Sequence, residues 1–331
     1  MNNASCLNTL DTSHAVFSVD GPEMCCAAGQ PVLNVMPVFE RVALIYNPAA
    51  RRVQNGGIRE LQQVANMLGA QGSSVEMLAT WGPNAASKLA RRAVSGGADL
   101  IIACGGDGTI NEVLAGVALS QVPLLILPGG TANVLAKELG LSNDWSKVVA
   151  LLGSGQVRRI SLGKMNGRYF ILMAGIGVDA GIVRVVNPKI KRLLGEGSFW
   201  LAGFRQWFRY RFEPFQVKLA SGERYQATFA LVSKARHYGG PFQLTPEAEF
   251  FSDQFDVCLF QGRSRWRYLR YLWSVTWKQH VRLPDVKHFK TDGVEVEGSS
   301  SIGVQVDGEL VGHLPQRFTI EKQALRLIVP R

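Results

Sequence analysis

The pattern of apolar and polar positions divides the chain into two halves of different texture. Between residues 41 and 157, short runs that are apolar at almost every position alternate with segments in which apolar residues recur every three or four positions. Fully apolar runs are typical of strands buried on both faces of a parallel sheet, and the longer period is typical of helices. The first half therefore predicts an α/β domain with helices on both faces of the sheet.

The predicted elements of this half follow one another as strand, helix, strand. The strands are "RVALIYNP", "SVEMLAT", "ADLIIACGG" and "VPLLILPGG". The helices are "IRELQQVANMLGAQG", "NAASKLARRAVSGG" and "TINEVLAGVAL". Ligands of such sheets bind at the carboxyl ends of the strands, and the glycine-rich loops of this chain fall at those ends.

After about residue 158 the pattern changes to short strands separated by Gly, Ser and Asp turns. Examples are "FDVCLFQG", "VEVEGSSSIGVQVDGEL" and "ALRLIVP". This texture predicts an antiparallel β domain over residues 158–331. The whole pattern thus predicts a flexible extension over residues 1–40, an α/β domain over 41–157 and the β domain, with the final strand, 324–331, a candidate to pack back on the α/β domain.

The charge of the chain indicates an anionic partner. Its 331 residues carry a formal net charge of +10, and an excess of Lys and Arg suits nucleotide phosphate, nucleic acid or an acidic membrane surface. No apolar run approaches the ~20 residues that a membrane span needs. Residues 1–40 contain no Lys or Arg, so the positively charged start of a signal peptide is absent.

The cysteines are scattered and form no Cys-x-x-Cys pair. They are Cys6, Cys25, Cys26, Cys104 and Cys258. An odd, irregular set in a chain of this size predicts free thiols in a reducing compartment and no zinc site.

The stretch "ACGGDGTINEVLAG", residues 103–116, is the first candidate for chemistry. A strand that runs through Gly105-Gly106-Asp107-Gly108-Thr109 into a helix places backbone N–H groups at a positively polarised helix start, which suits a phosphate. The loop lacks the Gly-Lys-Ser/Thr ending of a P-loop and the Gly-x-Gly-x-x-Gly fingerprint. A tight strand-to-helix turn with Asp as a cap is the alternative.

A second loop of the same design follows one strand–helix unit later, in "LPGGTANVLAKELG", residues 127–140. Two such loops at neighbouring strand ends can hold one polyphosphate from both sides. With "YNP", "HYGGPFQLTPEAEFFSDQFDV" and "VQVDGELVGHLP" in the same order, the chain from about Arg41 to its end resembles the diacylglycerol kinase catalytic family, which includes sphingosine and ceramide kinases. The resemblance implies a Rossmann-like α/β nucleotide-binding domain, a C-terminal β-sandwich domain and an active site between them.

The resemblance also implies site residues, with ATP and Mg²⁺ as cofactors. Those expected to contact ATP are Asn47, Pro48, Thr80, Gly105, Gly106, Asp107, Gly108, Thr109, Ile110, Asn111, Gly130, Thr131 and Asn133. Glu309 is expected to accept the proton of the lipid hydroxyl, with Asp307 as an orienting or metal-facing partner. Taken alone, the segment "VDGE" that contains them predicts a hairpin turn.

A structural magnesium site is implied as well. Its ligands would be the Asp253 carboxylate and the backbone carbonyls of Phe250 and Phe255. The family usually has Asp-Asp-Gly where this chain has Ser252-Asp253-Gln254, so the turn glycine of the site is missing.

Other departures bear on the substrate. Family members typed as diacylglycerol kinases have a Lys after the Asn-Pro strand end and two Asp residues that join it in a charged network. This chain has Arg51-Arg52, Asn133-Val134 and Ser161 at those positions, so the network cannot form in its usual way. Sphingosine kinases also lack the Asp of the second loop, so the departure weakens diacylglycerol as the specific substrate and leaves kinase chemistry in place.

Two basic aromatic segments suggest where the acceptor comes from. In "RSRWRYLRYLWSVTWKQH" a helical period places one apolar face opposite a cationic one. The apolar face holds Trp266, Leu269, Trp273 and Trp277, and the cations are Arg263, Arg267, Arg270 and Lys278. The second segment is "NPKIKRLLGEGSFWLAGFRQWFRYRF". Such segments can lie in the interface of an anionic bilayer, and the alternative is that their aromatics pack in the core.

These observations together predict a cytoplasmic lipid kinase that associates peripherally with the inner face of the membrane. It would use ATP and Mg²⁺ to phosphorylate a hydroxyl of a diacylglycerol-like or sphingoid-like lipid. Its partners would be the lipid substrate and an anionic membrane surface, with no nucleic acid and with a homodimer left open. An NAD kinase-like enzyme and a catalytically silent lipid-binding or regulatory protein are the alternatives.

Overall fold

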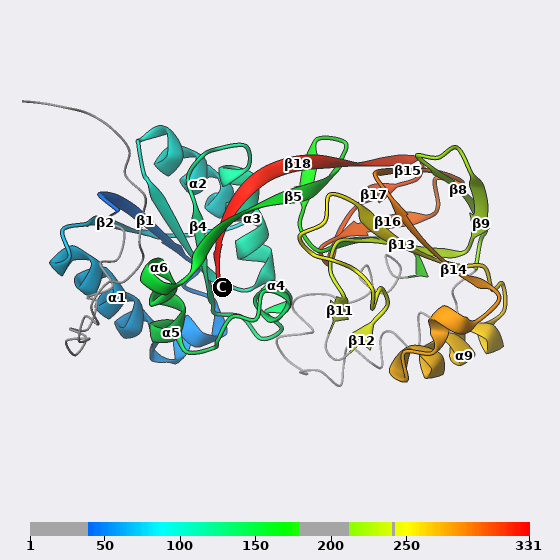
Figure 1. Cartoon of the computed structure of the whole chain (residues 1–331), viewed down its shortest axis with the longest axis horizontal. Coiled ribbons are helices and arrows are strands. Elements are labelled where there is room, and N and C mark those ends of the chain that lie inside the picture. Colours follow the sequence, from blue (N-terminus) through cyan, green and yellow to red (C-terminus); the bar gives the residue numbers. More distant parts are fainter. Residues whose placement is uncertain (1–38, 179–211, 240–241) are drawn as a thin grey trace, which may run out of the picture. The chain divides into compact units, whose positions relative to one another are not determined.

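The computed structural model describes residues 39–178, 212–239 and 242–331 (Figure 1). The predicted N-terminal extension therefore lies outside the described residues except for its last two positions, and so does the second basic aromatic segment except for its last residue. Among the residues that the structure describes, no helix is long and apolar enough to cross a membrane.

The first half folds as the predicted α/β unit. Its strands are β1 (Arg41–Tyr46), β2 (Ser74–Ala79), β3 (Leu100–Gly105) and β4 (Leu124–Pro128). Its helices are η1 (Val53–Gly57, a π-helical turn), α1 (Ile58–Ala70), α2 (Ala85–Ser95), α3 (Asp107–Val117), α4 (Val134–Glu138), α5 (Trp145–Val149) and α6 (Leu151–Ser154). The four strands pair in parallel in the order β2-β1-β3-β4.

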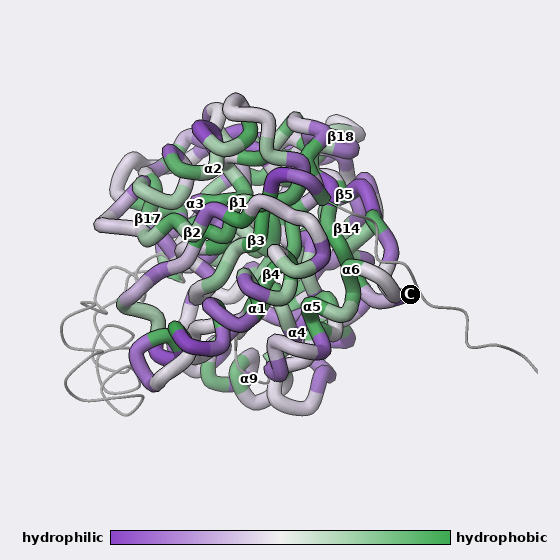
Figure 2. Tube along the Cα trace, turned by 90° about the vertical axis from the view of Figure 1, so that its left-hand side faces the viewer, coloured by the Kyte–Doolittle hydropathy of each residue, from purple (hydrophilic) through white to green (hydrophobic). Residues whose placement is uncertain are grey.

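Apolar side chains cover both faces of this parallel sheet, as the fully apolar strands predict. Ile45 and Ile101 pack in one core cluster with α2 and α3, and Leu44 and Ile102 pack in another with α1 and α5. Figure 2 shows the central strands β1, β3 and β4 in the colour of hydrophobic residues. Two-sided burial explains why no alternation appears in these strands.

The described residues of the second half form strands, with two helices inserted between two of them. The strands are β5 (Gln156–Met165), β6 (Arg168–Phe170), β7 (Met173–Gly177), β8 (Phe215–Leu219), β9 (Arg224–Ala227), β10 (Phe229–Ser233), β11 (His237–Gly239), β12 (Phe242–Gln243), β13 (Phe255–Phe260), β14 (Val286–Thr291), β15 (Gly293–Glu297), β16 (Gly303–Val306), β17 (Glu309–His313) and β18 (Gln316–Val329). Helices α9 (Arg265–Thr276) and η2 (His280–Arg282, 3₁₀) lie between β13 and β14.

These strands form the predicted β-sandwich. One sheet is antiparallel throughout, in the order β14-β13-β10-β7-β16-β17. Its inner face shares an apolar core with β8, β15 and β18 of the other sheet, where Val257 and Phe255 join Val296 and Phe318. The α/β-plus-β fold class is confirmed.

The two halves share one sheet through the final strand, which the sequence offered as a candidate to pack back on the α/β domain. Strand β18 pairs with β15 near its start, with β5 along most of its length, and with β4 in parallel at Leu327 and Leu124. Figure 1 shows β18 and β5 side by side along this course. Among the described residues the resulting sheet has 10 strands, because the two long strands extend the parallel sheet into the sandwich.

The packing of α2 on α3 yields a stability prediction. A Cβ at Gly116 of α3 would lie 2.6 Å from the Cβ of Ala90 and from the carbonyl oxygen of Ser87, so Gly116→Ala should lower the free energy of unfolding by about 1–3 kcal/mol. Gly69→Ala in α1 is the matched control, because a Cβ there meets nothing within 4 Å and alanine favours a helix by up to about 1 kcal/mol. Denaturant unfolding measures both, and equal effects of the two changes would contradict the close packing.

Candidate functional site

The first glycine loop lies where β3 meets α3. A Cβ at Gly105 would lie 2.7 Å from the Cβ of Thr109, so the turn has no room for a side chain there. The Thr109 hydroxyl accepts a hydrogen bond from Nδ2 of Asn47, at 3.0 Å. Asn47 follows β1, so the ends of two neighbouring strands are joined by predicted site residues.

The second glycine loop packs against the first, backbone on backbone. The N–H of Gly129 donates to the carbonyl of Gly105 at 2.8 Å. A Cβ at Gly130 would lie 2.5 Å from the Cα of Gly106, so only glycine allows this approach. Asn133 closes the second loop, since its Oδ1 accepts from the N–H of Gly130 at 2.9 Å.

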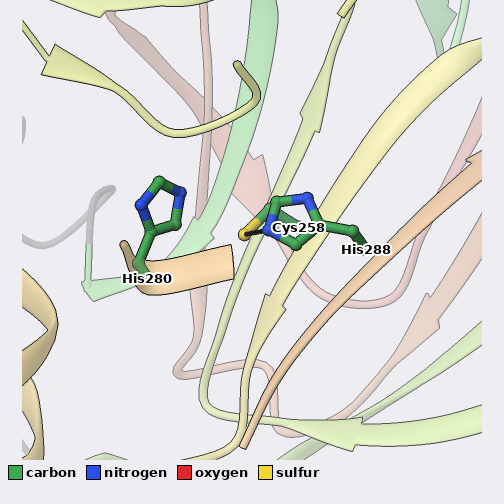
Figure 3. Close-up of side chains that lie close together, drawn as sticks. All are labelled: Cys258, His280 and His288. Atoms are coloured by element: carbon green, nitrogen blue, oxygen red, sulfur yellow. Dashed lines mark hydrogen bonds between the residues drawn. The ribbon is translucent and has the colours of Figure 1, made fainter. Parts of the chain in front are cut away.

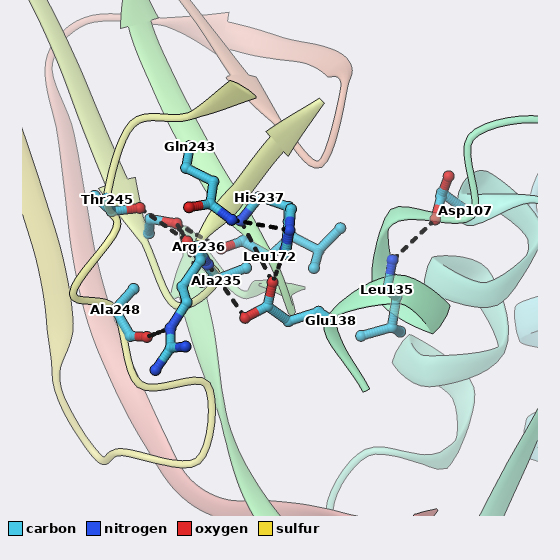
Figure 4. A network of polar contacts seen from close by, with 11 residues as sticks. Asp107, Leu135, Glu138, Leu172, Ala235, Arg236, His237, Gln243, Thr245 and Ala248 are labelled. Atoms are coloured by element: carbon cyan, nitrogen blue, oxygen red, sulfur yellow. Dashed lines mark hydrogen bonds and ion pairs between the residues drawn. The ribbon is translucent and has the colours of Figure 1, made fainter. Parts of the chain in front are cut away.

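Asp107 connects the first loop with the helix that follows the second. Its Oδ1 accepts a hydrogen bond from the N–H of Leu135 in α4, at 3.3 Å (Figure 4). Burial raises the pKa of Asp107, and the amides at the start of α4 oppose that rise. Asp107 therefore caps the start of α4 and not that of its own helix, since the N-cap of α3 is Gly106 and no side chain caps it.

The remaining predicted nucleotide residues lie at the same edge of the sheet. Thr80 follows β2, and its N–H donates to the carbonyl of Tyr46 at 2.9 Å. Pro48 and Thr131 are exposed, and Asn111 is half-buried in α3. Ile110 is buried in the apolar core, so only its backbone could contact a ligand.

The hairpin between β16 and β17 carries the two predicted catalytic carboxylates. Asp307 and Gly308 both have positive φ, 47° and 84°, so Asp-Gly forms the turn itself. The Asp307 carboxylate accepts hydrogen bonds from the N–H groups of Ile171, Leu172 and Met173 at 2.9 to 3.0 Å. Both of its oxygens are thus held by the backbone that leads into β7.

Glu309 reaches the first turn of α3. Its Oε1 lies 3.8 Å from the position that a Cβ would take at Gly108. Its other oxygen forms an ion pair with Arg168 of β6. Burial raises the pKa of Asp307 to about 6, and the carboxylate of Asp107 contributes to the rise, so the two aspartates are also close enough to interact. The structure therefore brings the first loop and the "VDGE" hairpin together.

Three partners in this region were missed by sequence reasoning. Arg168 pairs with Glu309, and Glu112 of α3 accepts hydrogen bonds from the N–H groups of Asn84 and Ala86 at the start of α2, at 2.9 and 3.0 Å. The carboxylate of Glu138 in α4 contacts the ring of His237. None of them stands in a motif with its partner, because the contacts depend on how the strands and helices pair.

Glu138 ties the second loop's helix to the strand β11. Its carboxylate contacts Nδ1 of His237 at 2.6 Å and accepts the backbone N–H groups of Arg236 and His237 at 3.2 and 3.4 Å (Figure 4). Gln243 of β12 contacts the other ring nitrogen of His237 at 3.1 Å. Through α4, a polar network thus runs from Asp107 to the "HYGG" strand.

The loop of the predicted structural metal site contains a cation of the protein itself. The buried ammonium group of Lys234 donates to the backbone carbonyl of Ser252, and Asp253 accepts a hydrogen bond from the hydroxyl of Ser161. Burial lowers the pKa of Lys234 to about 8, while Asp253 and Asp256 oppose this shift. These residues do not fit a divalent ion, since a metal would lie beside a buried positive charge and compete for an engaged carboxylate. Phe250 and Phe255 are both buried beside this loop.

The altered network of the first half also has a local replacement. Arg52 pairs with Glu60 of α1 at 2.6 Å, and its guanidinium lies 4.1 Å from the centre of the Trp145 ring. The backbone N–H of Arg52 donates to the carbonyl of Gly129 at 3.2 Å. The Arg52 side chain is therefore held by Glu60 and Trp145 without an aspartate, and the contact with the second glycine loop is made by the backbone N–H of this residue.

Cys258, His280 and His288 form a buried polar cluster in the β domain (Figure 3). Their ligand atoms lie within 4.8 Å of one another, and the thiol of Cys258 contacts Nε2 of His288 at 3.3 Å. Burial raises the pKa of Cys258 well above its ordinary value and lowers the pKa of both histidines, that of His288 to about 4. All three are therefore neutral at neutral pH, which suits a place between apolar layers.

Comparison with known proteins gives one consistent result. Residues 41–165 match the model of the diacylglycerol kinase catalytic domain, and residues 173–329 match that of the YegS C-terminal NAD kinase beta sandwich-like domain. The chain is 30% identical over 299 residues to a diacylglycerol kinase of Bacillus subtilis (strain 168), a match that covers 88% of this chain and 97% of the relative. A diacylglycerol kinase of Staphylococcus saprophyticus is 27% identical, and the match covers 88% of this chain and 96% of that relative.

A crystal structure of a diacylglycerol kinase from Bacillus anthracis shares the fold. The TM-score is 0.69 at 23% sequence identity, and the match covers 88% of this chain and 97% of that one. The fold and the paired loops thus define a lipid kinase enzyme. The chain belongs to the diacylglycerol kinase family, which confirms the resemblance seen in its motifs.

The buried histidine pair predicts a loss of stability in acid. Because the pKa of His288 in the folded protein is about 4, below the ordinary value near 6.5, the unfolded chain binds more protons between these values. The contribution of neutral His288 to the free energy of unfolding is fully present above pH ~6.5. It is lost as the pH falls toward ~4, by at most about 1.4 kcal/mol per pH unit for one proton. Denaturant unfolding of His288→Gln at several pH values should show a flatter dependence than the parent. His313→Gln, at an exposed site, is the control, and equal slopes for all three proteins would refute the assignment.

Proposed function

We propose that the enzyme transfers the γ-phosphoryl group of ATP to the hydroxyl of a lipid of the diacylglycerol or sphingoid class. The observation that carries this proposal is the approach of Glu309 to the first turn of α3, with Oε1 3.8 Å from the Cβ position of Gly108. A carboxylate from the β domain thereby faces the helix start that is expected to hold the phosphates. Phosphoryl transfer needs this pairing of a phosphate cradle with a group that orients the attacking hydroxyl.

The stacked glycine loops support ATP as the phosphoryl donor. Glycines 106 and 130 meet backbone to backbone, so no side chain stands between the two loops. The N–H groups of Gly129 and Gly130 donate to Gly105 and Asn133, which holds the second loop beside the start of α3, where the helix N–H groups face a phosphate. α3 has 11 residues, long enough for its positively polarised start to favour an anion. When bound, MgATP supplies the phosphoryl group and the cation that offsets its charge. Asp107, Asn47 and Thr109 would position the loop and the nucleotide.

The contacts of the two carboxylates support different roles for them. Asp307 has both oxygens engaged by backbone amides, so it acts as a positioning residue that fixes the turn. Glu309 is about half exposed and has one oxygen free of its Arg168 ion pair. In this proposal Glu309 accepts the hydroxyl proton, and Arg168 holds its side chain in place.

The lipid acceptor implies a membrane surface as its source. The positive net charge of +10 favours an anionic one, on the cytoplasmic side. The peripheral location and a homodimer stay predictions, and so do the domain boundaries at residues 40 and 157.

The nucleotide proposal is tested by opening the contact between the glycine loops. Gly130→Ala places a Cβ 2.5 Å from the Cα of Gly106, which must push the loops apart. Each charge-assisted hydrogen bond lost costs about 1.5–3 kcal/mol, so ATP affinity should fall by about tenfold or more. Calorimetric titration with ATP measures this, with Gly69→Ala as a matched control and thermal unfolding as a check of folding. Parent-like affinity in a folded Gly130→Ala variant would overturn the site.

The role of Glu309 is tested by kinetics with purified lipids at saturating ATP and Mg²⁺. A positioned general base contributes about 10²–10⁴-fold, so Glu309→Gln should lower kcat by that factor and leave ATP affinity nearly unchanged. Glu321→Gln is the control, because Glu321 also forms a surface ion pair, with Lys164 at 3.0 Å.

Diacylglycerol, a sphingoid base and NAD serve as separate acceptors in this assay. Phosphorylation of either lipid by the parent supports the proposal, and phosphorylation of NAD alone refutes it. Undiminished turnover by Glu309→Gln would remove Glu309 from its assigned role.

A further inference from the structure

Helix α9 presents an apolar stripe to solvent. Trp266, Trp273 and Trp277 are 81%, 71% and 63% exposed, and Leu272 and Leu269 are exposed between them. Tryptophan is large and apolar, and three exposed tryptophans on one short helix and its end form a patch of the kind that marks an interaction site. The predicted apolar stripe is exposed, and packing of its tryptophans in the core is excluded. The predicted cationic face opposite it is wrong, because that face holds the buried tyrosines Tyr268 and Tyr271.

The opposite side of α9 fixes the helix on the β domain. Tyr268 and Tyr271 are buried, with the hydroxyl of Tyr268 2.8 Å from that of Thr228 and the hydroxyl of Tyr271 bonded to Asp285. Arg267 adds an ion pair with Asp285 at 3.1 Å. The Ser264 hydroxyl caps the helix start by accepting the N–H of Arg267. The outward direction of the stripe is therefore set by side chains with polar partners.

The charges around the stripe are all positive. Between residues 257 and 284 the sequence has six Lys or Arg residues and no Asp or Glu. Of these cations, Arg265, Arg270 and Lys278 are exposed beside the tryptophans. An apolar centre flanked by cations is complementary to a surface with an apolar interior and anionic phosphates at its boundary.

A second copy of the chain matches this surface less well. A two-fold contact through α9 would bring the cations of one helix against those of the other, and like charges in a desolvated contact are unfavourable. Tryptophan, by contrast, is enriched where a membrane meets water, because its ring combines apolar area with one N–H group.

We propose that α9 is the membrane-docking element of this enzyme, with Trp266, Trp273 and Trp277 in the interface of an anionic bilayer and Arg265, Arg270 and Lys278 at the lipid phosphates. The inference rests on the proposed function in one respect, since a lipid acceptor requires access to a bilayer. Docking through α9 would hold the β domain, which carries Glu309, at the surface that contains the acceptor.

The test is sedimentation of the full chain with phosphatidylcholine vesicles that contain or lack phosphatidylglycerol. The parent should bind the anionic vesicles, and this binding should weaken as salt rises from ~0.1 M to ~1 M, where the screening length falls from ~10 Å to ~3 Å. The double variant Trp266→Ala/Trp273→Ala should bind about tenfold or more weakly, and Trp81→Ala, which removes a tryptophan that is 70% exposed in the α/β unit, should bind like the parent.

A charge pair of variants completes the test. Arg265→Gln/Arg270→Gln should lower binding by about tenfold and flatten its salt dependence, whereas Arg59→Gln/Lys88→Gln, which removes two exposed cations of α1 and α2, should not. The proposal is overturned if the parent and the tryptophan variant bind equally, or if the parent binds only neutral vesicles. It is also overturned if the parent binds no vesicles and either forms a dimer that the tryptophan changes break or binds an RNA oligonucleotide instead.

Turnover is measured separately with a short-chain, water-dispersed lipid acceptor. The α9 variants should retain the parent's kcat on it, because α9 lies outside the nucleotide loops and the "VDGE" hairpin. A failure of the proposed kinase reaction would appear here in the parent itself, while vesicle binding would still report on α9.

Discussion

The arrangement of the candidate site depends on the pairing of β18 with three other strands. Because β18 is hydrogen-bonded to β4, β5 and β15, the strand that ends in the second glycine loop and one of the two layers of the sandwich belong to one sheet. A register shift between Glu321 and Leu325 interrupts the β5 pairing, and Ser161 accepts the N–H of Gln323 there at 3.0 Å. The "VDGE" hairpin lies in the other, six-stranded sheet. It is tied to the shared sheet by Asp307, which accepts the N–H groups of Ile171 and Leu172 just after β6, and by the ion pair of Glu309 with Arg168 of β6.

The replaced positions of the charged network show how one set of interactions can substitute for another. Arg52 finds Glu60 and the Trp145 ring, Ser161 bridges the β18 bulge and Asp253, and Lys234 occupies the loop that a metal ion was expected to order. In each case a buried or half-buried polar group is satisfied by a neighbour in its own domain. Local pairs thereby replace the charged network that joins distant residues, and they keep the loops ordered. The residues around the lipid acceptor can then differ from those of other family members.

The sequence allowed the glycine loops and their place in the fold to be predicted, because the signal is local. Gly105 and Gly130 follow strands defined by apolar runs. Gly105 is required because Thr109 of its own loop leaves no room for a Cβ, and Gly130 is required because it approaches the backbone of Gly106. Arg168, Glu112 and Glu138 could not be found in this way, since their partners are 141, 26 and 99 residues distant. The return of the final strand to the α/β domain was anticipated, but its pairing with β5 and β15 was not, because a strand's period reports which faces are buried and not which strand it pairs with.

Helix α9 shows why periodicity finds two faces of a helix without telling which one is buried. Its tyrosines and its tryptophans both recur at helical spacing, and either set has enough apolar area for a core. The tyrosines are buried because each hydroxyl has a partner, in Thr228 and in Asp285. The tryptophans are left with a larger apolar area in water, which costs roughly 25 cal/mol for each Å² exposed. That unfavourable exposure, next to cations and without any acidic residue in the helix, is the physical reason to expect an apolar and anionic surface to cover α9.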